Sequence, residues 1–455
     1  MKPEAMQTDA GGALTGDPSA AGAGVPLISV RDLRVYFQTK RGRARAVDGV
    51  DLDIRDGETV GLVGETGSGK SVTARSLLRL VAMPPGVLAG GQVLYRPKER
   101  CHPCAGTQCG ACGGSGRRPV VCSSCRGGGC ELCEHTGRQT IDLLRAPESE
   151  LRRVRGDRIA MIFQDPAKAL NPGLTVRKQV SEVFLEHRSG DLLRAAGLGD
   201  GDEVGTLMRR AAHQRSNALE WVLMKVRPFS RRRARLDAAI DDAVMAALAD
   251  TRIPNPRKIM SSYPHELSGG MAQRVMIAQA LACDPDLLIA DEPTTALDVT
   301  IQARILDLIR ELQAEHGTAV LYISHDLSLV RRICDRVAVL YAGELAEVAP
   351  VDELFATPMH PYTRGLLAAI PTGHQERGRL TAIRGTVPEL IDPPPACRFH
   401  TRCDAAVDLC ASREPTLTEH GTGERPHRVA CFAYEDAAAL NVEVRDLPVL
   451  ERTDT

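Results

Sequence analysis

The sequence has neither a surplus of charge of one sign nor a long hydrophobic run. Its 57 Lys and Arg residues are balanced by 58 Asp and Glu residues, so the formal net charge at pH 7 is −1. This balance argues against a protein dedicated to binding nucleic acid, because such proteins usually carry a basic surplus. A membrane-spanning helix needs roughly 20 consecutive apolar residues, and no stretch of the chain approaches that length. We expect no signal peptide before the first domain.

Residues 64–71 have the composition of a loop that binds nucleotide phosphates. In such a loop glycines let backbone amides close around phosphate, a lysine reaches the outer phosphates, and a serine hydroxyl can hold Mg²⁺. Alone, this pattern indicates a nucleotide-binding site and nothing more specific. The predicted nucleotide-binding residues are Gly64, Glu65, Thr66, Gly67, Ser68, Gly69, Lys70 and Ser71.

A second glycine-containing string, residues 265–274, narrows this interpretation. It contains Leu-Ser-Gly-Gly and resembles the signature of ATP-binding-cassette (ABC) ATPases. The resemblance implies that Ser268, Gly269 and Gly270 lie at a helix N-terminus, where backbone amides attract anions. From there they would reach across a dimer to the γ-phosphate of the partner's ATP. Each of the two strings supports the interpretation of the other.

Further motifs follow in the order of the ABC family. Residues 287–290 are apolar and end in Asp291 and Glu292, as expected of a buried parallel strand with its active residues at the carboxyl end. The resemblance implies that Asp291 binds Mg²⁺ through water and that Glu292 orients or deprotonates the attacking water. Gln164 resembles the Q-loop glutamine, which senses Mg²⁺ or that water and relays the signal to a membrane subunit. His325 resembles the switch histidine that touches the γ-phosphate.

Two other positions complete the predicted nucleotide site. Asp298 matches the loop that bridges two ABC subunits, and Phe37, in preference to Tyr36, is expected to stack on adenine. Phosphoryl transfer to water needs a phosphate cradle, a cation and a positioned nucleophile. None of the corresponding residues is replaced, so the sequence predicts a hydrolytic site. Its catalytic residues would be Lys70, Gln164, Glu292 and His325, and Mg²⁺ would lie near Ser71, Gln164 and Asp291.

Four short strings indicate a branch within the ABC class. They are Leu-Asn-Pro at 170–172, Tyr-Pro-His-Glu at 263–266, His-Pro-Tyr-Thr at 360–363 and Gly-Thr-Val-Pro at 385–388. Together they look like the ATPase subunits of bacterial oligopeptide and dipeptide importers, a group that includes nickel importers. The resemblance implies a peripheral subunit on the cytoplasmic face of the membrane that powers peptide import.

The same resemblance implies a set of partners. These are two membrane permease subunits, a second ABC ATPase subunit and, indirectly, an extracellular solute-binding protein, with no nucleic acid. Met271 resembles the first of the two ATPase subunits of such importers, so the second is expected to be a paralogue. Three alternatives remain open: an importer of nickel or another small solute, a soluble ABC ATPase that acts on DNA, and an interaction protein that ATP regulates.

The expected fold class is α/β, an ABC-type P-loop ATPase with an antiparallel β-subdomain. The chain is longer than this fold requires, and the excess falls in two inserts, at residues 101–137 and 189–239. The second insert is predicted to enlarge the helical subdomain. The predicted divisions are a disordered tail at 1–26, the ATPase domain at 27–350, a C-terminal region typical of peptide importers at 351–435, and a tail at 436–455.

The first insert contains four C-x-x-C pairs in close succession. Each such pair bends two thiolates toward one tetrahedral metal ion, so eight cysteines can serve two Cys₄ zinc sites. The pattern is similar to the zinc domain of J-domain cochaperones. Disulfides or a metal-free redox switch are the alternatives, and two pairings remain open: first with second and third with fourth, or first with fourth and second with third. The predicted zinc ligands are Cys101, Cys104, Cys109, Cys112, Cys122, Cys125, Cys130 and Cys133.

Four other cysteines lie near the C-terminus at wider gaps, namely Cys397, Cys403, Cys410 and Cys431. They lack the C-x-x-C spacing of structural zinc, and four cysteines can ligate a [4Fe–4S] cluster. Some peptide-importer ATPases carry such a cluster in a similar segment. We therefore expect one [4Fe–4S] centre with a structural role, and zinc is the alternative metal.

Overall fold

The computed structural model describes residues 24–100, 117–199, 203–212, 229–294, 299–370, 383–391, 393, 396–421, 426–436 and 440. The chain forms two compact units, each described by itself below. One unit comprises Met1–Pro26 and Arg96–Thr140, and the other comprises Leu27–Tyr95 and Ile141–Thr455. Most of both predicted tails lies outside the described residues, as do Cys101, Cys104, Cys109, Cys112 and Asp298.

The larger unit begins with an antiparallel sheet in the strand order β2-β1-β4-β7. Along β2 apolar residues alternate with polar ones, and Val50, Leu52 and Ile54 are fully buried. This alternation is typical of a sheet with one face on the core. β4 and β7 flank the cysteine-rich insert in sequence and pair directly with each other. The strands are β1 (Ile28–Thr39), β2 (Gly42–Ile54), β4 (Gly86–Tyr95) and β7 (Ile141–Asp142).

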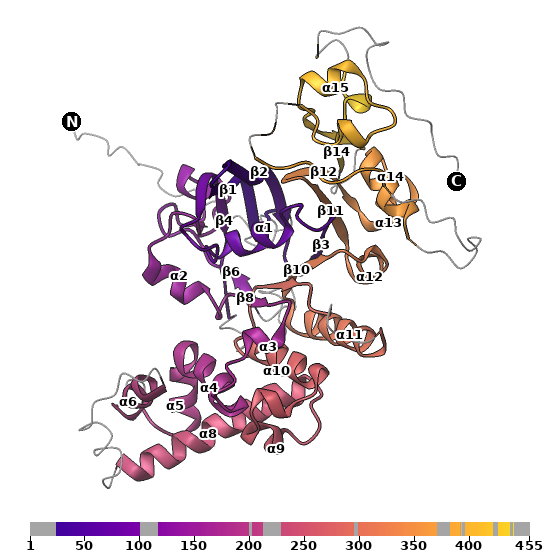
Figure 1. The fold of residues 1–455 in the computed structure, drawn as a ribbon. Helices are drawn as coiled ribbons and strands as arrows, with labels where there is room; N and C mark the ends of the chain where they lie inside the picture. The colour runs from indigo at the N-terminus through magenta and orange to yellow at the C-terminus, as the bar shows by residue number, and fades with distance from the viewer. Residues whose placement is uncertain are drawn as a thin grey trace, which may run out of the picture. The chain divides into compact units, whose positions relative to one another are not determined.

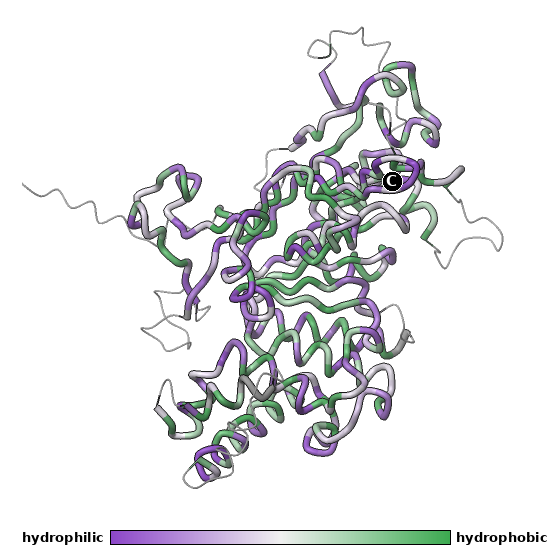
Figure 2. Tube along the Cα trace, turned by 60° about the vertical axis from the view of Figure 1, so that its left-hand side comes forward, coloured by the Kyte–Doolittle hydropathy of each residue, from purple (hydrophilic) through white to green (hydrophobic). Residues whose placement is uncertain are grey.

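A second, central sheet of the same unit has the strand order β13-β14-β12-β11-β3-β10-β9-β8. β8, β9, β10, β3 and β11 run parallel and are almost wholly buried, which explains their continuous apolar sequences. In Figure 2 these strands carry the hydrophobic colour. The strands are β3 (Thr59–Val63), β8 (Ile159–Ile162), β9 (Leu287–Asp291), β10 (Ala319–Ser324), β11 (Arg336–Tyr341), β12 (Glu344–Pro350), β13 (Leu417–His420) and β14 (His427–Ala430).

Helices connect these strands and lie along the central sheet (Figure 1). Residues of α11 and α12 share one buried cluster with β9, β10 and β11. The parallel strands therefore place their carboxyl ends, and the loops that follow them, along one edge. The helices are α1 (Lys70–Leu77), α2 (Glu148–Val154), α10 (Gly269–Leu281), α11 (Val299–His316), α12 (Leu327–Ile333), α13 (Val351–Ala356) and α14 (Pro361–Ala368).

A group of helices between β8 and α10 forms its own buried cluster. In α8, Leu236, Ile240, Val244 and Leu248 recur every four residues and are nearly completely buried, as expected of an amphipathic helix. The second predicted insert corresponds to α5, α6 and the first half of α8, while its residues 213–228 lie outside the described part. The elements are α3 (Pro166–Ala169), α4 (Val176–His187), α5 (Ser189–Ala195), α6 (Glu203–Ala212), α8 (Phe229–Asp250), α9 (Pro256–Ser261) and the 3₁₀ turn η4 (Pro264–Glu266).

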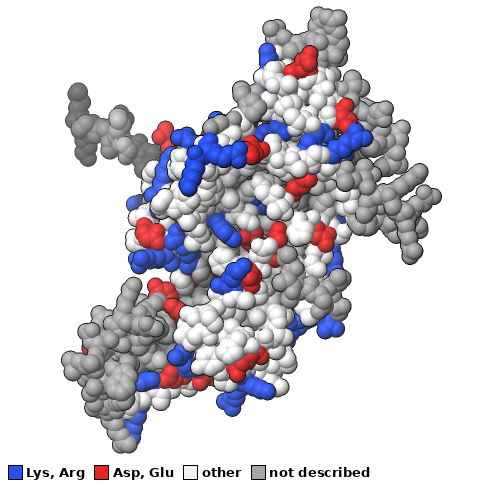
Figure 3. Space-filling model, in the orientation of Figure 1, with Lys and Arg blue, Asp and Glu red and all other residues white. Residues whose placement is uncertain are grey.

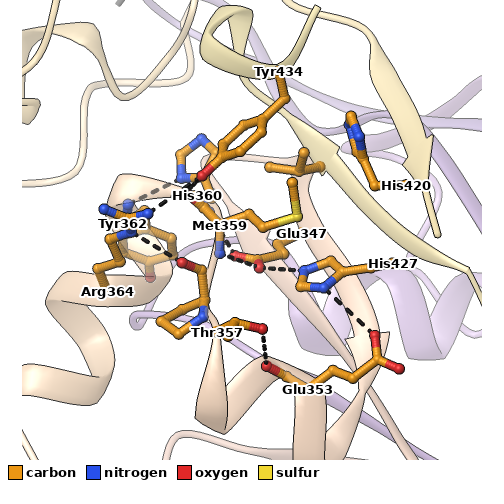
Figure 4. A network of polar contacts seen from close by, with 12 residues as sticks. Glu347, Glu353, Thr357, Met359, His360, Tyr362, Arg364, His420, His427 and Tyr434 are labelled. Carbon is orange, nitrogen blue, oxygen red and sulfur yellow. Dashed lines mark hydrogen bonds and ion pairs between the residues drawn. The ribbon is translucent and has the colours of Figure 1, made fainter. Parts of the chain in front are cut away.

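The C-terminal residues extend the central sheet, because β14 pairs with β12. A buried carboxylate, Glu347 of β12, holds this junction (Figure 4). It accepts the backbone N–H of Met359 at 2.7 Å and of His360 at 2.9 Å, and its Oε1 lies 2.6 Å from Nε2 of His427 in β14. Short elements complete the region: η5 (His400–Arg402), α15 (Asp408–Ser412) and η6 (Phe432–Tyr434).

The smaller unit is built from short elements. Its hairpin joins β5 (Lys98–Arg100) to β6 (Arg117–Pro119), and the 3₁₀ turn η3 spans Glu131–Cys133. Arg96 is buried and pairs with Glu134 at 2.5 Å. With so few apolar residues, this unit has little hydrophobic core of its own.

The surface carries both signs of charge. Figure 3 shows Lys and Arg side chains interspersed with Asp and Glu across the face in view, in keeping with the net charge of −1. Among the described helices, none combines the length and the apolarity that crossing a bilayer would take.

Candidate functional site

The phosphate loop leads from β3 into α1, which begins at Lys70. Gly69 precedes the helix with φ of +105°, and a Cβ there would lie 2.3 Å from the carbonyl oxygen of Ala46, so only glycine fits. The Lys70 ammonium donates to the carbonyl oxygens of Gly64 at 2.7 Å and Glu65 at 2.9 Å. Burial lowers the pKa of Lys70, and nearby carboxylates oppose this shift.

A hydroxyl and a carboxylate meet beside this lysine. Ser71 Oγ donates to Asp291 Oδ1 at 2.8 Å, and burial raises the pKa of Asp291. Asp291 Oδ2 is buried with no hydrogen-bond partner among the described residues, although Arg75 Nη2 lies 3.6 Å away. A hard divalent cation such as Mg²⁺ prefers oxygen ligands of these two kinds. The residues present therefore fit a Mg²⁺ ion held by Ser71 and Asp291.

Glu292 lies next to this pair, at the end of β9. Its carboxylate accepts the side-chain amide of Gln164 at 2.9 Å through Oε2, and its Oε1 lies 3.3 Å from His325 Nδ1. Gln164 follows β8 and His325 follows β10, so the carboxyl ends of adjacent strands bring the three side chains together. Glu292 itself has φ of +49°, a strained conformation for a residue other than glycine. Such strain is typical of functional positions.

The signature residues stand at the start of another helix. Ser268 caps α10 and accepts the N–H of Met271 at 3.4 Å, and Ser268 and Gly269 are exposed. This is the helix N-terminus that the sequence predicts. Among the aromatic candidates, Tyr36 is buried and donates its hydroxyl to Asp48 at 2.6 Å, whereas Phe37 is half-buried.

Sequence reasoning missed two residues that hold the phosphate loop from the C-terminal side. Arg402 forms a two-pronged ion pair with Glu65, and the Tyr362 hydroxyl accepts the backbone N–H of Glu65 at 2.8 Å. One sequence feature could have pointed to these contacts: Glu65 is an acidic residue inside a loop that binds anions. Such a residue needs a cationic partner, but nothing in the sequence indicates which of the many arginines supplies it.

The third and fourth C-x-x-C pairs come together in the smaller unit. The Sγ atoms of Cys122, Cys125, Cys130 and Cys133 all lie within 4.8 Å of one another. The Cys122–Cys130, Cys125–Cys133 and Cys130–Cys133 sulfur separations are 3.9, 3.8 and 3.7 Å. A tetrahedral Zn²⁺ with bonds of about 2.3 Å separates its sulfur ligands by about 3.8 Å. These four residues therefore fit one zinc ion without rearrangement.

The four C-terminal cysteines surround one small cavity of about 20 Å³. Within the described ranges, the only group of three or more His, Cys, Asp or Glu residues whose ligand atoms all lie within 4.8 Å of one another is the quartet of the smaller unit. The thiols of Cys397, Cys403, Cys410 and Cys431 are thus spread more widely than a single zinc ion requires.

Comparison with known proteins identifies the family of the chain. The ABC transporter family matches residues 47–108 and 133–295, and the family described as "Oligopeptide/dipeptide transporter, C-terminal region" matches residues 346–410. The oligopeptide transport ATP-binding protein AppD of Bacillus subtilis is 38% identical over 91% of this chain and 98% of its own length. The dipeptide transport ATP-binding protein DppD of that organism is 35% identical over 90% of this chain and 96% of its own length.

The solved structures of ABC cassettes share less sequence identity with this chain than these relatives do. The structure of cbiO1 from Clostridium perfringens, part of the ABC transporter complex cbiONQ, shares 22% identity with a TM-score of 0.44, covering 73% of this chain and 91% of that one. The phosphate loop, the Ser71–Asp291 pair and the Glu292 carboxylate define an ABC-type ATPase. The chain belongs to the family of oligopeptide and dipeptide transport ATP-binding proteins.

Proposed function

We propose that the chain is the ATP-hydrolysing subunit that powers import of peptides through partner membrane subunits. The names of its relatives and the matching C-terminal region support the peptide class. The observation that carries the hydrolytic role is the contact of Glu292 with both Gln164 and His325, beside Ser71 and Asp291.

Each residue has a role in this proposal. Lys70 and the phosphate-loop amides bind the phosphates, and Ser71 and Asp291 hold Mg²⁺, which would neutralise charge that develops on the phosphates. Glu292 orients the attacking water or accepts its proton. Gln164 and His325 hold the Glu292 carboxylate in place. Phe37 stacks on adenine.

The proposed assembly uses the exposed N-terminal end of the signature helix, at Ser268 and Gly269. Ser268, Gly269 and Gly270 would complete the ATP site of a second ATPase subunit, and Asp298 would bridge the two. Two permease subunits, reached through Gln164, would hold the pair on the cytoplasmic face of the membrane, and a solute-binding protein would deliver the peptide outside.

The catalytic proposal is tested by Glu292→Gln in the assembled transporter. We expect ATP to bind and turnover to fall at least about a hundredfold, because the amide cannot accept a proton from water. Lys70→Ala is the matched comparison and should weaken ATP binding itself. If Glu292→Gln turns over ATP at close to the wild-type rate, the catalytic assignment of Glu292 is refuted. A separate experiment, peptide uptake into membrane vesicles, tests whether peptides are the transported substrates.

We also propose a [4Fe–4S] cluster in the C-terminal region, bound by Cys397, Cys403, Cys410 and Cys431. The shared cavity and the wide thiol spacing support it. The cluster would cross-link segments that have little apolar core of their own. Anaerobically purified protein should be brown with about four irons per chain. A colourless protein with zinc bound at these four cysteines would refute the iron–sulfur proposal and show that the site binds zinc.

For the cysteine-rich insert we propose zinc, with Cys122, Cys125, Cys130 and Cys133 as one complete site. The sulfur separations support the pairing of the third C-x-x-C with the fourth. Cys101, Cys104, Cys109 and Cys112 would then hold a second ion. Zinc would stabilise a unit that buries few apolar side chains.

A further inference from the structure

We propose that Arg402 is a positioning residue for ATP binding, which acts on the phosphate loop through Glu65. The inference rests on the proposed ATPase function and concerns how the loop is held. Arg402 lies 337 residues from Glu65 in sequence, in the segment that carries Cys397 and Cys403. The C-terminal region would thus help to shape a site to which it contributes no ligand.

The contact between the two side chains is two-pronged. Arg402 Nη1 lies 2.6 Å from Glu65 Oε2, and Nη2 lies 3.0 Å from Oε1. The Arg402 side chain is only 3% exposed and that of Glu65 is 29% exposed. The hydrogen bond to Glu65 raises the pKa of Arg402. Planar pairs of this kind fix orientation as well as distance.

The guanidinium is itself held firmly. Its Nε donates to the carbonyl oxygen of Arg384 at 2.7 Å, and Nη1 also lies 3.3 Å from the Tyr341 hydroxyl. The guanidinium carbon lies 5.7 Å from the centre of the Tyr341 ring and 5.9 Å from that of Phe399. Because these contacts hold the Arg402 guanidinium in one position, it can hold the Glu65 carboxylate in one orientation.

Glu65 transmits this position to the phosphate-binding groups. Its carbonyl oxygen accepts both the Lys70 ammonium at 2.9 Å and the Ser68 N–H at 3.1 Å. Its own N–H donates to the Tyr362 hydroxyl at 2.8 Å. The side chain, the N–H and the carbonyl of Glu65 are therefore all engaged. A loop held at so many points is pre-organised for phosphate and loses less entropy when ATP binds.

A second arginine of the same segment strengthens the link. Arg398 directly follows Cys397, and its Nη2 lies 2.6 Å from Asp48 Oδ2. Asp48, in β2, also accepts the Tyr36 hydroxyl of β1 at 2.6 Å. One segment, residues 397–403, thus contacts the phosphate loop through Arg402 and strand β2 through Arg398.

The test uses the purified full chain and Mg²⁺-ATP. We expect Arg402→Gln and Glu65→Gln each to weaken ATP binding about tenfold, since charge-assisted hydrogen bonds are the strong ones. KM for ATP should rise while kcat of the assembled transporter changes little, because Glu292 is not touched. The double variant should be no worse than either single variant, because both remove the same contact.

The chain offers a matched control in Arg41, which forms an exposed two-pronged pair with Glu389. Arg41→Gln should leave ATP affinity unchanged. If Arg402→Gln and Glu65→Gln bind ATP as tightly as Arg41→Gln does, the positioning role is refuted while the ATPase function stands. Glu65→Gln serves as the second variant should Arg402→Gln fail to fold. A wild-type chain that binds no ATP would refute both proposals.

Discussion

Substituting Cys125 by serine should remove one zinc ion per chain and no more. Three of the sulfur pairs in its quartet are already 3.7 to 3.9 Å apart, against about 3.8 Å for ligands of zinc, and all four thiols lie within 4.8 Å of one another. No backbone movement is needed to close the site. If all eight cysteines serve zinc, the content should fall from about two ions per chain to about one.

The assay is elemental analysis of protein purified under reducing conditions, with absorbance of a cobalt-substituted sample as a check on thiolate ligation. Cys283→Ala is the control, because that thiol is fully buried in the core of the larger unit, where burial raises its pKa to about 11. The control should keep all of its zinc. Unchanged zinc content in Cys125→Ser would refute the zinc site at this quartet. Loss of every zinc ion would refute the proposal that the quartet and the other four insert cysteines form two separate sites.

Three further predictions concern the larger unit. Gly69→Ala should abolish ATP binding with little change in the fold of other elements, measured by calorimetric titration, because the added Cβ would lie 2.3 Å from Ala46 O. Burial lowers the pKa of His360 to about 4, so the folded state should lose stability as pH falls from about 6.5 toward 4. His360→Asn should flatten this dependence in thermal melts, and an unchanged slope would contradict it. Ile240→Ala should cost about 2–5 kcal/mol in denaturant titrations, since that side chain is 1% exposed; a loss below about 1 kcal/mol would contradict it.

Motif chemistry made much of the nucleotide site predictable from sequence. A phosphate loop needs glycine where the backbone turns left-handed, as at Gly69, and carboxylates follow buried strands, as Asp291 and Glu292 do. These requirements are local, so they appear as residue types at short spacing. The family relationship followed from the same strings and is confirmed by the relatives.

The contact that holds Glu65 could not be predicted in this way. Arg402 is one of many arginines, and only the packing of the C-terminal segment against β11 and the phosphate loop selects it. The pairing of the insert cysteines was likewise open. The short links favoured the first pair with the second and the third with the fourth, whereas the resemblance to cochaperones favoured the first with the fourth and the second with the third. The structure brings the thiols of the third and fourth pairs within 4.8 Å of one another.

The sequence by itself determined the class of enzyme, the candidates for the phosphate-binding and water-positioning residues, and the thiol-rich composition of two segments. Only the tertiary structure brought Gln164, Glu292 and His325 into contact from three separate strands. It alone also placed Arg402 against Glu65 of the phosphate loop and Arg398 against Asp48 of β2. The reason is physical. A motif at short spacing predicts the local conformation and chemistry of a few neighbouring residues, whereas contacts between distant segments depend on how the whole core packs.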